Sequence, residues 1–204
     1  FDFDGTLADT NQLIINSFKH IYSVYKNIDC SEEYILSTFG EPLHTSILRD
    51  FGSYNYEEVM SCYRDYQHDR FNKEVILYDT VPETLEYLKN RKIKMGIVTS
   101  RMRSSTLNAL KNFKIDKYFD VVISADDTEN HKPHKEPLLM ALNKLNSSAS
   151  ESLYIGDSKY DMECAINAQS TPVLAGWQPN SGKLAEQYNI KYVLEKMWDL
   201  TKLI

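Results

Sequence analysis

Apolar residues recur at helical spacing through the first third of the chain. After Thr10, residues three or four positions apart form one apolar face of a predicted helix: Ile14, Phe18, Ile21, Tyr22, Tyr25 and Ile28. Asp9 or Thr10 is available to cap the start of this helix. Further helical segments are expected over residues 31–39, 43–51 and 56–71. Residues 11–79 are therefore predicted to form an all-helical unit.

From Thr80 onward the pattern changes, and short apolar runs alternate with amphipathic segments. The runs predict strands at residues 94–98, 121–124, 153–155 and 172–175, and the other segments predict helices at 82–91, 104–113, 138–145 and 161–168. Such alternation is typical of a mainly parallel sheet flanked by helices. We therefore predict an α/β core made of residues 1–10 and 80–204, with the helical unit inserted into it.

Composition narrows the partners that this chain can have. With 204 residues it can bury one substantial core plus an insertion, but not two large domains. The 29 acidic residues outnumber the 23 basic ones, and no run of five basic residues occurs, so nucleic acid is not an expected partner. No apolar stretch approaches the ~20 residues that span a bilayer, so no membrane partner is expected. We expect a small-molecule ligand and a monomer or weak dimer.

The cysteines suggest a compartment. There are three of them, widely spaced, at Cys30, Cys62 and Cys164. An odd number with such spacing fits neither a disulfide framework nor a zinc site. The expectation is a cytoplasmic protein, because a reducing cytosol keeps thiols free.

The first seven residues, FDFDGTL, carry the most informative polar pattern. In an extended strand, side chains two positions apart point to the same side, so Asp2 and Asp4 can approach one reaction centre. Gly5 then allows the backbone to turn sharply. One carboxylate can attack phosphorus while the other moves the proton of the leaving group, and two such charges close together need a cation. The alternative is an ordinary Asp-Gly turn after a strand.

Two later segments end in residues that could bind a phosphoryl group. Thr99 follows the apolar run 94–98, at the carboxyl end of a predicted strand, where ligands settle in open parallel sheets. Residues 130–137, NHKPHKEP, form a loop that two prolines restrain, and Lys132 in it could neutralise charge shared by a nucleophile and a phosphate. Taken singly, Thr99 is an ordinary strand end and Lys132 belongs to a solvated basic loop.

A further strand end carries two carboxylates. In residues 153–161, LYIGDSKYD, Asp157 lies at the strand tip and Asp161 four positions later, so both can face one point. Oxygen ligands with waters are what Mg²⁺ prefers. The alternative is capping of a helix by Asp157 or Ser158. Capping explains one acidic residue, but it does not explain four ordered strand ends that all carry such side chains.

With these four segments in this order, the chain resembles the haloacid dehalogenase superfamily of phosphatases. The resemblance implies a Rossmann-like core with a type-one helical cap that closes over the site. It implies that Asp2 is the nucleophile, Asp4 the general acid and base, Thr99 a phosphoryl-binding residue and Lys132 the family lysine.

The same resemblance implies the cofactor and the binding residues. Mg²⁺ is expected in a cluster formed by Asp2, Asp4, Asp157 and Asp161, with Asp4 contributing its backbone carbonyl. Phosphate or the remainder of the substrate is expected to contact Gly5, Thr6, Ser100 and Arg101 in the core, and His44 and Arg64 in the cap. Glu41, Arg49 and Arg70 are further candidates in the cap.

Several stretches resemble the branch of phosphoglycolate phosphatases and PpaX-type pyrophosphatases, the latter more strongly: residues 9–11, 39–43, 63–66, 125–129 and 132–137. The implied reaction is hydrolysis of a small phosphorylated metabolite or pyrophosphate through an aspartyl-phosphate. One alternative is a phosphosugar mutase, which usually has Glu-Asp in place of Gly156-Asp157. Another is a catalytically silent regulatory protein, which typically lacks a carboxylate or the lysine.

Two positions depart from the family pattern. Lys135 stands where a second proline is usual, and it is expected at the surface. Residues 77–81, LYDTV, lack the Pro-Gly pair that is usual at the hinge before the core.

Overall fold

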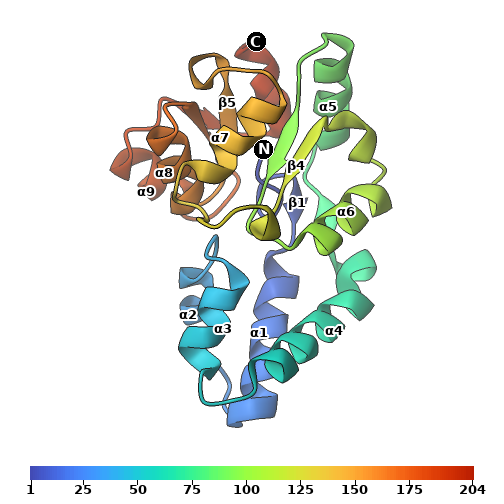
Figure 1. Ribbon diagram of the computed structural model, residues 1–204, viewed down its shortest axis with the longest axis vertical. Helices are drawn as coiled ribbons and strands as arrows, with labels where there is room; N and C mark the ends of the chain where they lie inside the picture. Colours follow the sequence, from blue (N-terminus) through green and yellow to red (C-terminus); the bar gives the residue numbers. More distant parts are fainter.

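A sheet of parallel strands runs through the larger part of the molecule (Figure 1). The computed structural model describes all 204 residues. The strands of this part are β3 (Gly96–Val98), β4 (Val121–Ile123), β5 (Leu153–Gly156), β6 (Thr171–Ala175) and β7 (Tyr192–Leu194). β3 pairs with β4, and β6 pairs with β5 and β7, all in parallel. The α/β fold predicted from the alternating pattern is confirmed.

The first residues of the chain join these two groups of strands into one layer. The N–H of Val98 donates to the Phe1 carbonyl, and the N–H of Asp2 donates to the Ile155 carbonyl, both at 2.8 Å. Residues 1–3 therefore lie between β3 and β5, at the centre of the layer. Because parallel strands all end at one edge, the residues that follow these three segments meet there.

Helices cover both faces of this layer. α5 (Val81–Asn90) and α6 (Arg103–Asn112) pack with Ile97 and Ile155 in the largest apolar cluster. α7 (Glu136–Lys144) and α8 (Lys159–Asn167) pack with Val98 and Tyr154 in another. Neighbouring residues in a strand point to opposite faces, so the two pairs of helices lie on opposite sides of the sheet. α9 (Ser181–Gln187) packs beside β6.

Four helices form the inserted cap, at the lower end of Figure 1. They are α1 (Asn11–Lys26), α2 (Glu32–Ser37), α3 (Leu43–Phe51) and α4 (Tyr56–Glu74). Their apolar faces enclose a cluster of their own, in which Ile21, Ile47 and Val59 are fully buried. α1 lies along α4, which continues past its predicted end to Glu74. No helix in the molecule combines the length and the apolar character that a membrane span requires.

The cap and the core are connected by a short antiparallel ribbon of β1 (Ala8–Asp9) and β2 (Ile76–Leu77). Of the two candidate caps of α1, Asp9 accepts a hydrogen bond from the N–H of Asn11 at 3.3 Å, whereas the Thr10 side chain makes no capping bond. In the segment that lacks the usual Pro-Gly pair, Thr80 adopts a φ of 66°, a conformation that glycine adopts readily. The boundaries 11–79 stay a prediction.

Candidate active site

The two aspartates of the first motif line one cavity but bind different cations. Asp2 is buried at the end of the central strand, and its Oδ1 accepts a hydrogen bond from Lys132 Nζ at 2.8 Å. Asp4 is more exposed, and its Oδ1 accepts one from Arg101 Nη1 at 2.8 Å. Both carboxylates therefore line the cavity, and each is paired with a cation of its own.

The turn after Asp4 is tied to the loop after β5. Gly5 has a φ of +74°, and a Cβ added there would lie 2.3 Å from Oδ2 of Asp157, so only glycine fits. The Thr6 hydroxyl donates to Oδ1 of Asp157 at 3.1 Å. The indole N–H of Trp177 donates to the Gly5 carbonyl at 2.9 Å. Thr6 therefore holds Asp157 in position and Gly5 leaves room for its carboxylate, and neither Gly5 nor Thr6 is among the residues that line the cavity.

Lys132 is a buried cation that joins two carboxylates. Its Nζ donates to Oδ1 of Asp2 at 2.8 Å and to Oδ1 of Asp161 at 2.6 Å. Asp161 also accepts hydrogen bonds from the Tyr154 hydroxyl at 3.0 Å and from the Ser158 hydroxyl at 2.6 Å. Both oxygens of Asp161 are thus occupied by bonds within the chain, and these bonds fix the position of the lysine.

The sequence left two roles open for the polar residues at the start of α8, namely capping the helix and binding a metal ion. Ser158 and Asp161 form a capping box, in which each side chain accepts a hydrogen bond from the backbone N–H of the other. Asp157 takes no part in this cap. The Ser-x-x-Asp spacing is a signal that could have identified Asp161 as the capping partner. No signal in the sequence pointed to Tyr154, which lies inside a strand.

Burial changes the acidity of these groups. It raises the pKa of Asp2 to about 7, an effect that Lys132 opposes and that Asp161 and Asp4 reinforce. Burial, followed by the charges of Asp161 and Asp2, raises the pKa of Asp157 well above its usual range. Burial alone would lower the pKa of Lys132, but Asp161 and Asp2 outweigh it and raise the pKa, so the ammonium stays charged. One ammonium cannot balance these carboxylates, and a further cation would relieve their repulsion.

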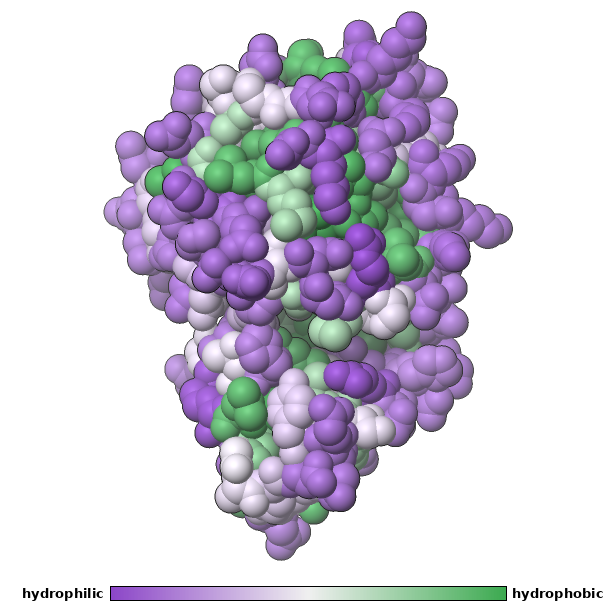
Figure 2. All heavy atoms as spheres, viewed as in Figure 1, coloured by the Kyte–Doolittle hydropathy of each residue, from purple (hydrophilic) through white to green (hydrophobic).

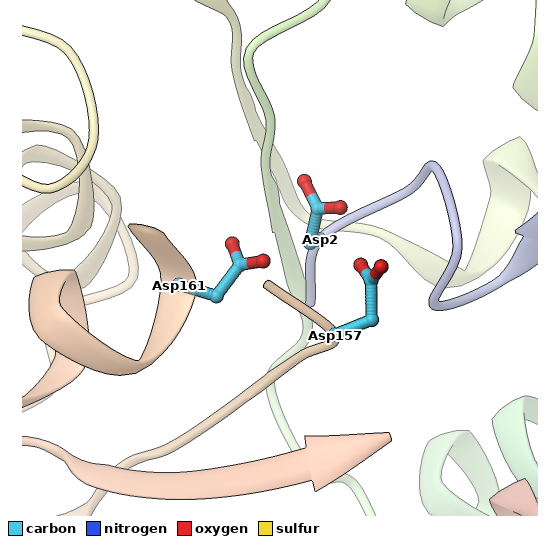
Figure 3. A group of neighbouring side chains, drawn as sticks. All are labelled: Asp2, Asp157 and Asp161. Carbon is cyan, nitrogen blue, oxygen red and sulfur yellow. The ribbon is translucent and has the colours of Figure 1, made fainter. Parts of the chain in front are cut away.

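The carboxylates of Asp2, Asp157 and Asp161 converge on one space (Figure 3), and an oxygen from each lies within 4.8 Å of the others. All these donors are oxygens, the ligand type that Mg²⁺ prefers. Since both oxygens of Asp161 are already hydrogen bonded, the free carboxylate oxygens belong to Asp2 and Asp157. The backbone carbonyl of Asp4 also accepts no hydrogen bond. This donor set fits Mg²⁺.

The segment after β3 contacts both the site and the cap. Thr99 is buried and lines the cavity, and its hydroxyl accepts a hydrogen bond from the N–H of Arg101 at 3.2 Å. The Ser100 hydroxyl donates to the Gly40 carbonyl in the cap at 3.2 Å. The three residues predicted here, Thr99, Ser100 and Arg101, therefore lie together at the edge of the sheet.

A cavity of about 730 Å³ lies between this edge and the cap. Its floor contains Asp2, Asp4, Lys132 and Asp157, and its roof consists of residues from α1, α3, α4 and the loop after α2. Figure 2 shows apolar residues at the surface where the broad upper part of the molecule meets the narrower lower part. The cavity is thus bounded by these carboxylates on one side and by the cap on the other.

Two cap residues predicted to contact substrate, His44 and Arg64, line the cavity. The ring of His44 packs edge-on against that of His131 in the core, with centroids 5.2 Å apart. Burial and the neighbouring His44 lower the pKa of His131, whose Nδ1 has no hydrogen-bond partner. Arg64 is exposed and takes part in none of the ion pairs of the cap.

The other cap candidates are held by bonds within the cap. Arg49 Nη1 donates to both carboxylate oxygens of Glu41, at 2.9 and 2.8 Å, so Glu41 reaches the cavity wall with its charge already paired. The guanidinium of Arg70 lies 3.8 Å over the ring of Tyr66. Neither arginine lines the cavity.

Known proteins share this arrangement of sequence and structure. The profile of haloacid dehalogenase-like hydrolases matches residues 1–175. Pyrophosphatase PpaX of Bacillus mycoides is 39% identical over 204 residues, which cover 100% of this chain and 94% of that protein. A Caldanaerobacter subterraneus protein assigned as a pyrophosphatase PpaX is 41% identical over 209 residues, covering 100% of this chain and 92% of that protein.

Solved structures agree. The crystal structure of a Lactobacillus plantarum protein assigned as a phosphoglycolate phosphatase matches with a TM-score of 0.88 and 26% identity, covering 100% of this chain and 97% of that one. The chain therefore belongs to the haloacid dehalogenase superfamily, in the branch of phosphoglycolate phosphatases and PpaX pyrophosphatases, and it is a hydrolase.

Proposed function

We propose that this chain is a Mg²⁺-dependent phosphatase that acts on a small phosphorylated metabolite or pyrophosphate through a phosphorylated Asp2. The position of Asp2 carries this proposal. It lies buried on the cavity floor, where Lys132 holds one oxygen and the other makes no hydrogen bond within the chain. A carboxylate fixed in this way can present its free oxygen to phosphorus.

Mg²⁺ would be held by Asp2, Asp157 and the backbone carbonyl of Asp4. When bound, it supplies positive charge that stabilises the anionic oxygens of the transferring phosphoryl group. Lys132 contributes a second fixed positive charge beside Asp2. In this proposal Asp161 is a positioning residue that holds Lys132, since both of its oxygens are bonded within the chain.

The reaction would have two steps. In the first, an oxygen of Asp2 attacks phosphorus, the bond to the leaving oxygen breaks, and Asp4 gives that oxygen a proton. In the second, Asp4 removes a proton from water, the water oxygen attacks the same phosphorus, and the bond to Asp2 breaks to release phosphate. The Thr99 hydroxyl and loop N–H groups would stabilise the equatorial oxygens.

Pyrophosphate and 2-phosphoglycolate are the first substrates to consider, because these activities are named for the relatives. A phosphosugar mutase is less well supported. Mutases usually carry Glu where this chain has Gly156, and a Cβ at Gly156 would lie 2.3 Å from the Cβ of Asp161. A glutamate there would displace the group that holds Lys132.

Phosphate release, measured with Mg²⁺ and with EDTA, tests the proposal. The substrates are pyrophosphate, 2-phosphoglycolate, glucose phosphates, nucleoside monophosphates and acetyl phosphate. Metal-dependent release with one substrate far ahead of the others is the expected result. No release from any of them by folded protein would contradict the proposal and favour a mutase or a regulatory protein.

A further inference from the structure

Arg101 is a largely buried cation on the side of the cavity where Asp4 lies. Its side chain is 11% exposed, and its Nη1 donates to Asp4. The guanidinium carbon lies 5.5 Å from the ring centre of Phe3 in the core and 5.3 Å from that of Phe71 in α4 of the cap. Contact with two aromatic rings and one carboxylate gives this guanidinium a defined position.

Two nitrogens of this guanidinium have no acceptor in the chain. Nε is buried and makes no hydrogen bond, and Nη2 makes none either. Buried N–H donors without a partner are rare in folded proteins, and each one calls for an explanation. Arg101 lines the cavity together with Asp4, and its Nη2, unlike Nε, is not fully buried, so a ligand in the cavity can supply an acceptor to Nη2.

No other cation at the cavity combines burial with free donors. Lys132 is committed to Asp2 and Asp161. Arg64 lines the cavity but is exposed. The free donors of Arg101 are therefore the most fixed positive charge left for a ligand.

The position of Arg101 indicates which part of the ligand it would contact, and this step rests on the proposed function. Asp4 gives its proton to the leaving oxygen, so the leaving group must lie beside Asp4. Arg101 is bonded to Asp4 and is therefore beside the leaving group too. A planar guanidinium binds a carboxylate or a phosphate through paired N–H donors, in a geometry that a neutral hydroxyl does not match.

We propose that Arg101 selects substrates whose leaving group carries its own negative charge next to the leaving oxygen. Phosphoanhydrides such as pyrophosphate and phosphorylated hydroxy acids such as 2-phosphoglycolate belong to this class, whereas phosphorylated sugars and nucleosides do not. A charged leaving group satisfies the free donors of Arg101. A neutral leaving group leaves at least part of a buried charge without an acceptor, and sites built for a polar group discriminate strongly against ligands that lack it.

The test compares 2-phosphoglycolate with its amide, 2-phosphoglycolamide. The amide has the same leaving oxygen but lacks the negative charge of the carboxylate. In the wild-type chain, kcat/KM is expected to be at least about tenfold higher for the acid. Arg101→Gln should reduce this ratio at least about tenfold, and Arg101→Lys should retain only part of it, because the charge remains but the paired N–H donors are lost. Arg103→Gln is the matched control, since Arg103 pairs with Asp127 and does not line the cavity.

Two outcomes would overturn the proposal. The first is a wild-type kcat/KM that is nearly the same for 2-phosphoglycolate and its amide. This result needs no variant, so the test does not depend on the folding of Arg101→Gln. The second is a folded Arg101→Gln variant that loses activity on acid and amide in equal proportion, because Arg101 would then act only by positioning Asp4. Failure of the proposed function would look different: neither compound would be hydrolysed in a Mg²⁺-dependent way, or Asp2→Asn would stay active.

Discussion

The floor and the roof of the cavity are built in opposite ways. On the floor, charged side chains are bonded to one another and buried, as in the contacts of Lys132 with Asp2 and Asp161. In the roof, His44 and Arg64 reach the cavity without an ion pair, and Arg64 is exposed. The comparison teaches that the groups proposed for phosphoryl chemistry, and Arg101 beside them, are held in place by bonds within the chain, whereas His44 and Arg64 keep freedom to adapt to a substrate.

This contrast also separates two kinds of energetic cost. Burying several carboxylates around one ammonium is unfavourable unless each is paired or neutralised, so every contact on the floor affects both stability and activity. Exposed groups in the roof carry little of the stability of the fold. Changes on the floor should therefore abolish activity, and changes in the roof should redistribute it among substrates.

Asp2→Asn should have the largest effect. Asparagine keeps the size of the side chain but cannot form the aspartyl-phosphate, so we expect turnover to fall at least about 1,000-fold on every substrate. The fold should survive, because a buried charge is removed. Phosphate release and thermal unfolding measure the two effects, and Asp69→Asn, at an exposed position in the cap, is the control. Activity within tenfold of wild type would show that Asp2 is not the nucleophile.

Lys132→Met tests the pairing on the floor. Removing the ammonium leaves Asp2 and Asp161 buried beside each other, which should cost about 3–5 kcal/mol of unfolding free energy as well as activity. Lys135→Met is a matched control three residues away. Lys135 is exposed and forms no ion pair, so Lys135→Met should change the free energy of unfolding by no more than about 0.5 kcal/mol. Equal unfolding free energies for the two variants, measured in urea, would mean that the buried network contributes little.

Mg²⁺ and pH should act on the floor together. Burial raises the pKa of Asp2 to about 7, and Asp157 is also raised. A group whose pKa is higher in the folded than in the unfolded chain adds stability at low pH that is lost as the pH rises through the folded value. In EDTA, the melting temperature should therefore fall between about pH 5 and pH 8. Mg²⁺ neutralises the carboxylates once their protons are lost. The increase in melting temperature that Mg²⁺ causes should therefore be larger at pH 8 than at pH 5, by about 4 °C or more.

Two further measurements test whether the carboxylates of the floor cause this dependence on pH and Mg²⁺. Asp2→Asn removes one of the titrating groups, so it should flatten the pH dependence of the melting temperature in EDTA. Calorimetric titration of Mg²⁺ near pH 7 should show proton release, because the ligands must be deprotonated. If Mg²⁺ raises the melting temperature equally at pH 5 and at pH 8, the carboxylates of this site do not need a cation.

The sequence predicted the floor better than the roof, and the reason lies in topology. Parallel strands end at one edge of a sheet, so the sequence pattern alone predicts that Asp2, Thr99 and Asp157 meet there. The contacts that hold them could not be foreseen in the same way. Tyr154 occupies an ordinary strand position, and Trp177 reaches the Gly5 carbonyl from a loop far away in the sequence, so neither has a local pattern.

In the cap, periodicity predicted where helices lie but not which polar side chains face the cavity. The sequence favoured Arg64 as a substrate contact over Arg49 and Arg70, but it did not show which contacts separate the three arginines. Arg49 is occupied by Glu41, and Arg70 is stacked on Tyr66, because the packing of the cap brings these partners within reach. The folded cap shows the physical difference, because Arg64 lines the cavity and the other two arginines do not.

The roof should give the smallest effects. Arg64→Ala and His44→Ala are expected to lower kcat/KM for the preferred substrate by about tenfold or less, since a charge-assisted hydrogen bond at an exposed site contributes modestly. Hydrolysis of p-nitrophenyl phosphate should persist, because attack on phosphorus uses the floor. Arg70→Ala removes a guanidinium outside the cavity and should leave the substrate ranking unchanged. If Arg64→Ala and His44→Ala also leave the ranking unchanged, the roof does not read the substrate. In that case selectivity would have to come from buried groups such as Arg101, and the difference between floor and roof would be one of packing rather than of function.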